Sequence, residues 1–184
     1  ILIPARMESS RFPGKPLAKI NGKEMIIRVL ERCTYNYDVF AIVNDLKISN
    51  VIQKNGFKYI LIKENCKTGT DRVFEVFKET LNSEAEIIVN LQGDMPNIEP
   101  QDIQALIKYM TLGKCEIGTL ASEINSETEL KDQNVVKVVV EKKMSPGMFT
   151  KALDFVRSKN NQENQVYHHV GIYAFTNKAL LRYV

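Results

Sequence analysis

The sequence holds few of the residues that define disulfide-bonded, metal-binding or membrane-spanning proteins. Its three cysteines (Cys33, Cys66 and Cys115) are odd in number and widely spaced, and no Cys/His pair has zinc-ligand spacing. Neither a disulfide framework nor a zinc site is expected, and reduced thiols are typical of the cytosol. No apolar stretch approaches the roughly 20 residues that span a bilayer. The N-terminal apolar run is also too short for a signal peptide, so no membrane partner is expected.

Several common catalytic and nucleotide-binding patterns are missing as well. The chain has no Walker loop of the form Gly-x4-Gly-Lys-Ser/Thr and no Gly-x-Gly-x-x-Gly. These absences argue against a P-loop NTPase and leave a dinucleotide-binding fold without its fingerprint. Ser9 and Ser10 have no nearby His/Asp arrangement, so nucleophilic serine chemistry is not supported either.

Length and composition fit one ordinary domain over residues 1–184. The 184 residues are 44% hydrophobic and 26% charged, with both signs mixed, which is typical of a chain that builds a core beneath a polar surface. The chain begins without Met, directly in an expected strand, and stops inside an expected helix. We therefore expect it to be incomplete at both ends.

Hydrophobic periodicity predicts an α/β fold. Continuous apolar runs indicate buried strands over residues 1–4, 39–43 and 86–91. Amphipathic stripes indicate helices over residues 25–33, 48–56, 70–81 and 102–112. Alternation of this kind predicts βαβ units and a mostly parallel, doubly wound sheet.

The alternation of expected strands and helices ends at about residue 116. Strand-like segments follow at residues 117–123, 135–141 and 170–175 without clear helices between them, which predicts a mixed or antiparallel portion. Residues 142–168 are polar and irregular, and we expect a mobile loop or an arm that serves dimerisation.

Positive charge is concentrated in the first 32 residues. They hold seven basic and three acidic side chains, a net +4, whereas the whole chain carries +3. The first expected strand opens into a loop with Arg6, Arg11, Gly14 and Lys15, a grouping suited to a polyphosphate. A solvated basic loop is the alternative. A nucleic-acid-binding protein would more often spread its charge over a face, so no nucleic-acid partner is expected.

Polar residues follow the strand expected at residues 86–91. Asp94 lies at its carboxyl end, where it would face the basic loop, and Mg²⁺ is often held by one or two carboxylates plus substrate phosphate oxygens. Gly93 would allow a ligand to approach, although Gly-Asp after a strand is also a common turn.

Two further segments allow both a structural and a functional interpretation. Residues 68–72 could cap a helix through Thr70 or Asp71, and Arg72 could contact an anion there. His168 and His169 would point to opposite faces of a strand, so joint metal ligation is not expected. One of them could contact a polar substrate.

The sequence resembles the 3-deoxy-manno-octulosonate (KDO) cytidylyltransferases, or CMP-KDO synthetases, in several blocks that keep the same order. The matching blocks are residues 3–17, 21–23, 68–72, 90–96, 134–139 and 169–173. The resemblance implies a nucleotide-diphospho-sugar transferase fold. It also implies a reaction of CTP with KDO that gives CMP-KDO and pyrophosphate for lipopolysaccharide synthesis. Mg²⁺ as cofactor, a homodimer and a bacterial cytosol are implied as well.

The resemblance also implies roles for individual residues. Arg11 and Lys15 correspond to residues that grip the triphosphate. Ala5, Arg6 and Arg72 fall where the family holds the nucleotide. Asp94 falls on the Mg²⁺-binding aspartate. The residues that correspond to the sugar-acid site are Gln92, Arg157, His169 and Tyr173.

The chain departs from the family pattern at a few places. Met95 stands where the family usually has Glu, and Val43-Asn44-Asp45 replaces the more usual Ala-Thr-Asp. A C-terminal metal-binding aspartate and a Glu-Gln pair near the sugar are expected beyond Val184. Two alternatives stay open: a cytidylyltransferase for another acidic sugar such as sialic acid, and a non-catalytic nucleotide-binding module on the same fold.

Overall fold

The computed structural model describes residues 1–8, 12–33, 37–63, 66, 68–80, 84–158 and 165–183. The chain divides into two compact units. The first comprises Ile1–Gly118 and Ile172–Val184, and the second comprises Thr119–Gly171. Within the described ranges, no helix is long and apolar enough to cross a membrane.

A mostly parallel sheet forms the centre of the first unit. Its strand order is β5-β4-β1-β6-β10, with bounds β1 (Leu2–Ala5), β4 (Phe40–Val43), β5 (Tyr59–Leu61), β6 (Ile87–Leu91) and β10 (Val166–Thr176). Strands β5, β4, β1 and β6 are parallel, whereas the last part of β10 runs antiparallel to β6. Parallel strands are buried on both faces, which explains their continuous apolar runs.

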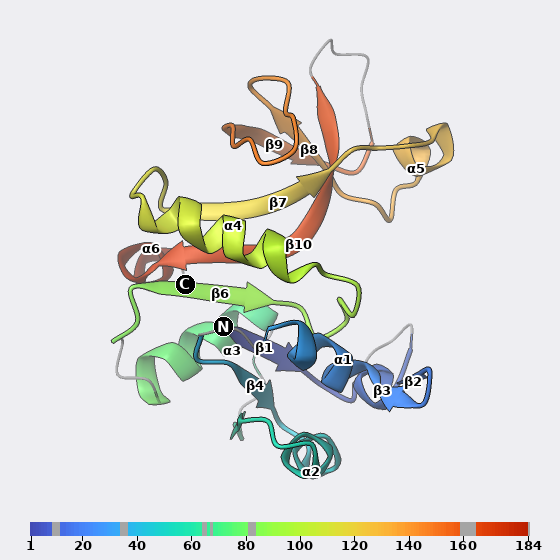
Figure 1. The fold of residues 1–184 in the computed structure, drawn as a ribbon, viewed down its shortest axis with the longest axis vertical. Coiled ribbons are helices and arrows are strands. Elements are labelled where there is room, and N and C mark those ends of the chain that lie inside the picture. Colours follow the sequence, from blue (N-terminus) through green and yellow to red (C-terminus); the bar gives the residue numbers. More distant parts are fainter. Residues whose placement is uncertain are drawn as a thin grey trace. The chain divides into compact units, whose positions relative to one another are not determined.

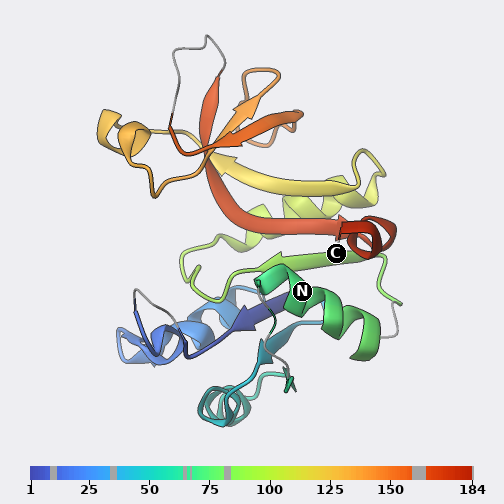
Figure 2. The same cartoon turned by 180° about the vertical axis from the view of Figure 1, so that it is seen from behind.

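Helices cover both faces of this sheet. Helix α4 (Pro100–Thr111) lies in front of the strands in Figure 1, and α3 (Gly69–Glu75) and α6 (Asn177–Tyr183) lie in front of them in the reverse view of Figure 2. Helix α2 (Leu46–Lys54) packs beside β4 and β5. One π-helical turn, η2 (Val76–Thr80), continues α3. The predicted doubly wound architecture is therefore confirmed.

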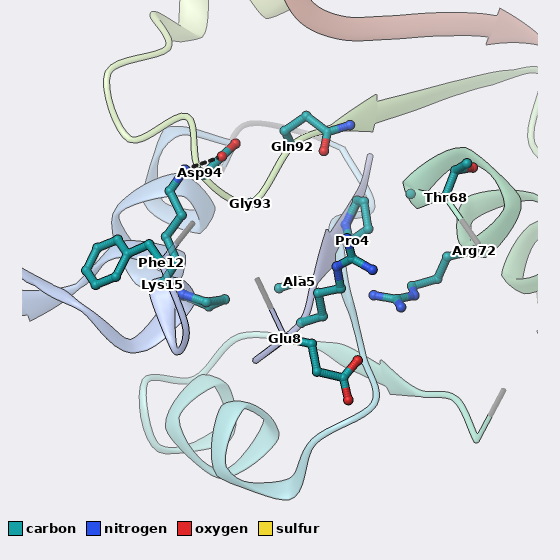
Figure 3. Close-up of a pocket in the computed structure, with 13 residues that line it drawn as sticks. Pro4, Ala5, Glu8, Phe12, Lys15, Thr68, Arg72, Gln92, Gly93 and Asp94 are labelled. Carbon is teal, nitrogen blue, oxygen red and sulfur yellow. Dashed lines mark hydrogen bonds and ion pairs between the residues drawn. The ribbon is translucent and has the colours of Figure 1, made fainter. Parts of the chain in front are cut away.

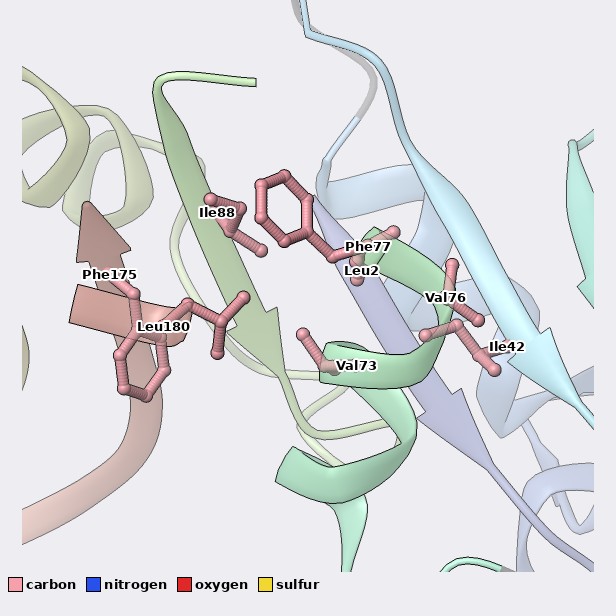
Figure 4. Close-up of a cluster of buried hydrophobic side chains, with 8 residues drawn as sticks. All are labelled: Leu2, Ile42, Val73, Val76, Phe77, Ile88, Phe175 and Leu180. Carbon is pink, nitrogen blue, oxygen red and sulfur yellow. The ribbon is translucent and has the colours of Figure 1, made fainter. Parts of the chain in front are cut away.

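Helix α3 is fixed to the sheet by an apolar cluster (Figure 4). The cluster joins β1, β4, β6 and β10 to α3, η2 and α6, and each member is at most 3% exposed: Leu2, Ile42, Val73, Val76, Phe77, Ile88, Phe175 and Leu180. Burying an aliphatic or aromatic side chain of this size contributes roughly 1.5–3 kcal/mol. This packing determines where the first turn of α3 lies relative to the ends of β1 and β6.

A short hairpin separates β1 from the first long helix. The 3₁₀ turn η1 (Lys15–Leu17) leads into β2 (Lys19–Ile20) and β3 (Lys23–Glu24), which pair antiparallel. Helix α1 (Met25–Arg32) follows at once, and its buried residues include the predicted stripe members Ile26, Val29 and Leu30.

Antiparallel strands dominate the second unit. Strand β8 (Lys137–Val140) pairs with β9 (Ala152–Val156) on one side and with the first residues of β10 on the other. Strand β7 (Ile117–Ser122) enters this unit from the first, and the short helix α5 (Glu127–Lys131) lies between β7 and β8. The mixed or antiparallel portion that the sequence predicts is thus confirmed.

The structure corrects the expectation for residues 142–168. This segment is not wholly irregular, because it includes β9 and the beginning of β10. Strand β9 leaves no buried apolar run in the sequence, because four of its five side chains are exposed. Helix α5 was not expected either. The final residue of the helix predicted over 70–81 lies outside the described residues.

Candidate active site

A cavity of about 290 Å³ opens in the first unit where the ends of β1 and β6 meet the first turn of α3 (Figure 3). Four segments line it: the end of β1, the loop that leads to η1, the residues that begin α3, and the residues that follow β6. In open α/β sheets, ligands bind at this carboxyl edge of the strands. Arg6 and Lys15 of the basic loop and Gln92, Gly93 and Asp94 after β6 line this one cavity.

Gly93 allows the ends of β6 and β1 to approach closely. A Cβ atom added at Gly93 would lie 3.0 Å from the carbonyl oxygen of Pro4 and 3.3 Å from Cδ1 of Ile26. The nearest of these atoms belongs to the backbone and cannot swing aside. A glycine at this position therefore brings Asp94 to the mouth of the cavity.

The basic loop after β1 is closed by its own backbone. Gly14 adopts φ 71°, in the left-handed region that glycine favours, and its N–H donates to the carbonyl of Met7 at 2.9 Å. The next residue, Lys15, begins η1, and the buried Pro16 follows it. The closed loop directs Lys15 into the cavity.

Lys15 and Asp94 form an ion pair across the mouth of the cavity. The Nζ atom of Lys15 lies 2.5 Å from Oδ2 of Asp94, and the two side chains are 35% and 46% exposed. A pair with this exposure contributes at most about 1 kcal/mol to stability. Either side chain can therefore leave the ion pair and bind a ligand at little cost in free energy.

Arg72 is buried in the wall of the cavity. It is 4% exposed, and its Nε atom has no hydrogen-bond partner in the part of the chain that the structure describes. A buried guanidinium is expensive unless an anion or several acceptors satisfy it. The cavity thus presents a positive group that a bound anion would stabilise.

A capping box fixes the turn that carries Arg72. The backbone N–H of Asp71 donates to Oγ1 of Thr68 at 3.1 Å, and the N–H of Thr68 donates to Oδ2 of Asp71 at 2.8 Å. The structural interpretation of residues 68–72 as a helix cap is confirmed, with Thr68 rather than Thr70 or Asp71 as the N-cap. The same turn lines the cavity through Thr68, Gly69 and Arg72.

Charged side chains of both signs line the cavity. Arg6, Lys15 and Arg72 supply positive charge, and Glu8 and Asp94 supply carboxylates. Glu8 and Phe12 were not singled out from the sequence, because only the path of the loop after β1 decides which of its residues face the cavity. Ala5 and Gln92, both predicted for the site, also line it.

Not every predicted site residue is found in the lining of this cavity. Arg11 falls outside the described residues. Tyr173, in the part of β10 that belongs to the first unit, packs against the apolar cluster and stacks on Phe175 with 6.2 Å between ring centroids. Burial, with a smaller contribution from Tyr183, raises the pKa of Tyr173. Among the described residues, the lining of the cavity does not include Tyr173.

The two adjacent histidines belong to the second unit and have different partners. Nδ1 of His168 lies 2.6 Å from Oε1 of Glu129, and this hydrogen bond is the main reason that the pKa of Glu129 is lowered. Nε2 of His169 lies 3.0 Å from Oγ1 of Thr119, and its ring packs edge-on against Phe155. Separate partners are what the alternation of a strand predicts.

Burial and the neighbouring His168 lower the pKa of His169. A lowered pKa favours the neutral imidazole, which is suited to a hydroxyl or amide rather than to neutralising a carboxylate. Arg157, in the same unit, donates from a guanidinium nitrogen to the carbonyl of Gln133 at 3.1 Å. Across the described ranges, no group of three or more His, Cys, Asp or Glu could hold a metal ion.

Comparison with known proteins agrees with this geometry. The family model described as cytidylyltransferase matches residues 1–184. The chain belongs to the cytidylyltransferase family. A solved CMP:2-keto-3-deoxy-manno-octonic acid synthetase complexed with CTP superimposes with a TM-score of 0.85 at 38% identity, over 99% of this chain and 75% of that one.

Two curated relatives of this cytidylyltransferase have related names. An 8-amino-3,8-dideoxy-manno-octulosonate cytidylyltransferase from Shewanella pealeana is 40% identical, over 97% of this chain and 74% of the relative. A 3-deoxy-manno-octulosonate cytidylyltransferase from Chelativorans sp. is 38% identical, over 100% of this chain and 76% of the relative. The resemblance recognised from the sequence blocks is confirmed.

Replacing Gly93 tests whether the ends of β6 and β1 need a glycine in order to pack as closely as they do. We expect Gly93→Ala to lower the free energy of unfolding by roughly 1–3 kcal/mol, because the new methyl group overpacks against a backbone oxygen. Urea denaturation measures the loss. Asn97→Ala, at an exposed position in the same loop after β6, is the matched control and should stay within about 0.5 kcal/mol of the parent. Equal stability of the two variants would contradict the role of the close approach.

Proposed function

We propose that this chain transfers CMP from CTP to the anomeric hydroxyl of KDO, giving CMP-KDO and pyrophosphate. The observation that carries the proposal is the buried Arg72, whose Nε atom has no described partner, in a cavity that Arg6 and Lys15 also line. A nucleoside triphosphate supplies the negative charge that these groups lack. The names of the relatives then point to cytidine as the nucleoside and to a KDO-type sugar as the acceptor.

In this reaction the anomeric oxygen forms a bond to the α-phosphorus while the bond from that phosphorus to the pyrophosphate oxygen breaks. The hydroxyl proton is released. The protein contributes positioning and neutralisation of charge. We assign Arg11 and Lys15 to the leaving pyrophosphate, and Ala5, Arg6 and Arg72 to the nucleotide.

Asp94 is the residue that would hold Mg²⁺. Its exposed carboxylate already faces a cation, the Lys15 ammonium, in the cavity. A single carboxylate fits Mg²⁺, which usually keeps several waters and completes its shell with substrate phosphates. Bound there, the ion would reduce the repulsion between CTP and the sugar carboxylate. Lys15, released from Asp94, would then pair with the phosphates.

We assign the sugar acid to Gln92, Arg157, His169 and Tyr173. Gln92 lies in the same cavity wall as Asp94. The neutral imidazole of His169 suits a sugar hydroxyl, whereas the guanidinium of Arg157 suits the carboxylate.

An 8-amino analogue of KDO is the second candidate acceptor. One relative named for the 8-amino sugar is 40% identical to this chain, and one named for KDO is 38% identical, so identity does not separate them. Sialic acid is a third candidate acceptor, whereas a non-catalytic nucleotide-binding role would need no acceptor at all.

We further propose a cytosolic enzyme that supplies CMP-KDO for lipopolysaccharide synthesis. The described cysteines Cys33, Cys66 and Cys115 are unbridged, in keeping with a reducing compartment. Residues 1–184 would act as one nucleotidyltransferase domain, with neither nucleic acid nor membrane as partner.

Magnesium-dependent release of pyrophosphate from CTP tests the proposal. We expect release with KDO, little or none with sialic acid, and a rate with the 8-amino sugar that ranks it against KDO. A coupled pyrophosphate assay on the longest natural form of the chain measures all three. Binding of CTP without release with any acceptor would favour the non-catalytic role.

Removing the carboxylate of Asp94 tests its assignment. We expect Asp94→Asn to lower kcat by roughly 10²–10³-fold, the usual effect of losing one electrostatic contact in a transition state. The stability should change by no more than about 1 kcal/mol, since Asp94 forms only a half-exposed ion pair. Asp102→Asn, an exposed position in the first turn of α4, is the control for the loss of one charge. Normal turnover in Asp94→Asn would refute the assignment.

We propose that the chain forms a homodimer through the exposed apolar side chains around β9. Met148, Leu153 and Phe155 are 55%, 51% and 45% exposed, and exposed apolar clusters often mark interfaces. We expect Leu153→Glu to lower the dimer fraction in sedimentation velocity. Lys151→Glu, at an exposed and charged position next to β9, is the control. A parent chain that sediments as a monomer would contradict the proposal.

A further inference from the structure

Asn90 is a polar side chain sealed inside the first unit. It lies in β6 and is 0% exposed. Its Nδ2 donates to Oγ1 of Thr70 at 3.2 Å, whereas its Oδ1 is buried without a hydrogen-bond partner in the part of the chain that the structure describes. Its one side-chain hydrogen bond therefore goes to the first turn of α3.

The position of Asn90 links the apolar cluster to the cavity. Alternate residues of a strand share a face, so Asn90 lies between Ile88, a member of the cluster, and Gln92, which lines the cavity. On the neighbouring strands its register partners are Leu2 and Tyr173.

The stability of the fold does not explain why position 90 holds an amide with only one of its two polar atoms hydrogen-bonded. A buried acceptor without a partner is unfavourable, and an apolar side chain of similar shape would remove the penalty. The second buried polar atom of this region without a described partner, Nε of Arg72, lies on the same helix as Thr70. Both unsatisfied atoms thus adjoin the turn that borders the cavity.

We propose that Asn90 is a positioning residue for nucleotide binding. By holding Thr70 against β6, it keeps Arg72 and Gln92 at a fixed separation across the cavity. The tight packing of Gly69 is consistent with this role, because a Cβ there would lie 3.3 Å from Cγ of Pro4 and 3.7 Å from the amide nitrogen of Gln92. A small movement of the turn would therefore change the cavity. The inference rests on the proposed binding of CTP.

A double-mutant cycle separates positioning from stability. Thr70→Val leaves both polar atoms of the Asn90 amide unsatisfied and should lower stability. Asn90→Leu loses the same hydrogen bond but also removes the unsatisfied acceptor, so it should lose less stability. Both variants should bind CTP less tightly. Together they place two apolar groups in contact, which should restore much of the melting temperature. We expect the double variant still to bind CTP with Mg²⁺ about tenfold or more weakly in isothermal titration calorimetry, because the turn is no longer held.

Two conservative variants complete the experiment. Thr70→Ser keeps the hydroxyl and should bind CTP within about twofold of the parent. Ile103→Val shortens a buried side chain of α4, outside the apolar cluster beneath α3, and should lower stability without changing the Kd. A double variant with the parental Kd, or a Kd that follows the melting temperature in every variant, would overturn the inference. A parent that fails to bind CTP would overturn the proposed function together with it.

Discussion

The close approach of Gly93 to the carbonyl of Pro4 sets the geometry on which the candidate site depends. It brings the end of β6 beside the end of β1 at a separation where a side chain would be crowded. Asp94 then follows at the mouth of the cavity, opposite the loop that carries Lys15. The apolar cluster beneath α3 sets the third wall, since it fixes the helix whose first turn presents Arg72.

The Lys15–Asp94 ion pair suits an exchange of partners on ligand binding more than it stabilises the fold. Lys15 and Asp94 satisfy each other when no ligand is bound, but they are too exposed to stabilise the fold appreciably. A polyphosphate with a divalent cation offers each of them a new partner of the correct sign. Arg72, by contrast, is buried and has no described acceptor for its Nε, so an anion adds an interaction there and replaces none.

Much of the fold of the first unit could be predicted from the sequence. Buried parallel strands such as β4 and β6 leave continuous apolar runs, and helices α1 and α4 leave stripes of period 3.6. The site was predictable for a related reason, because Lys15 and Asp94 both follow such strands and the carboxyl ends of parallel strands share one edge.

The elements that were missed are held by interactions that leave little trace in the sequence. Strand β9 pairs through its backbone while most of its side chains are exposed, and α5 spans only five residues. Glu8 and Phe12 line the cavity because of the path of a loop, which no periodicity encodes. The role of Asn90 is harder still to predict. The sequence shows a polar residue within an apolar run, but only the fold shows that its partner lies on α3.

Two of the three buried side-chain polar atoms without a partner among the described residues lie beside one turn, and the third, Oγ1 of Thr150, lies in the second unit. The first turn of α3 has a regular capping box, yet buried polar atoms of Arg72 and Asn90 beside it lack partners among the described residues. Sites that bind ligands commonly break local rules that the rest of a fold obeys. The residues that we assign to the nucleotide thus lie at a sheet edge and on a turn with unsatisfied polar neighbours. His169 and Arg157, which we assign to the sugar, belong to the second unit. Since the residues that we assign to CTP belong to the first unit, a substitution at Arg157 or His169 would alter none of them.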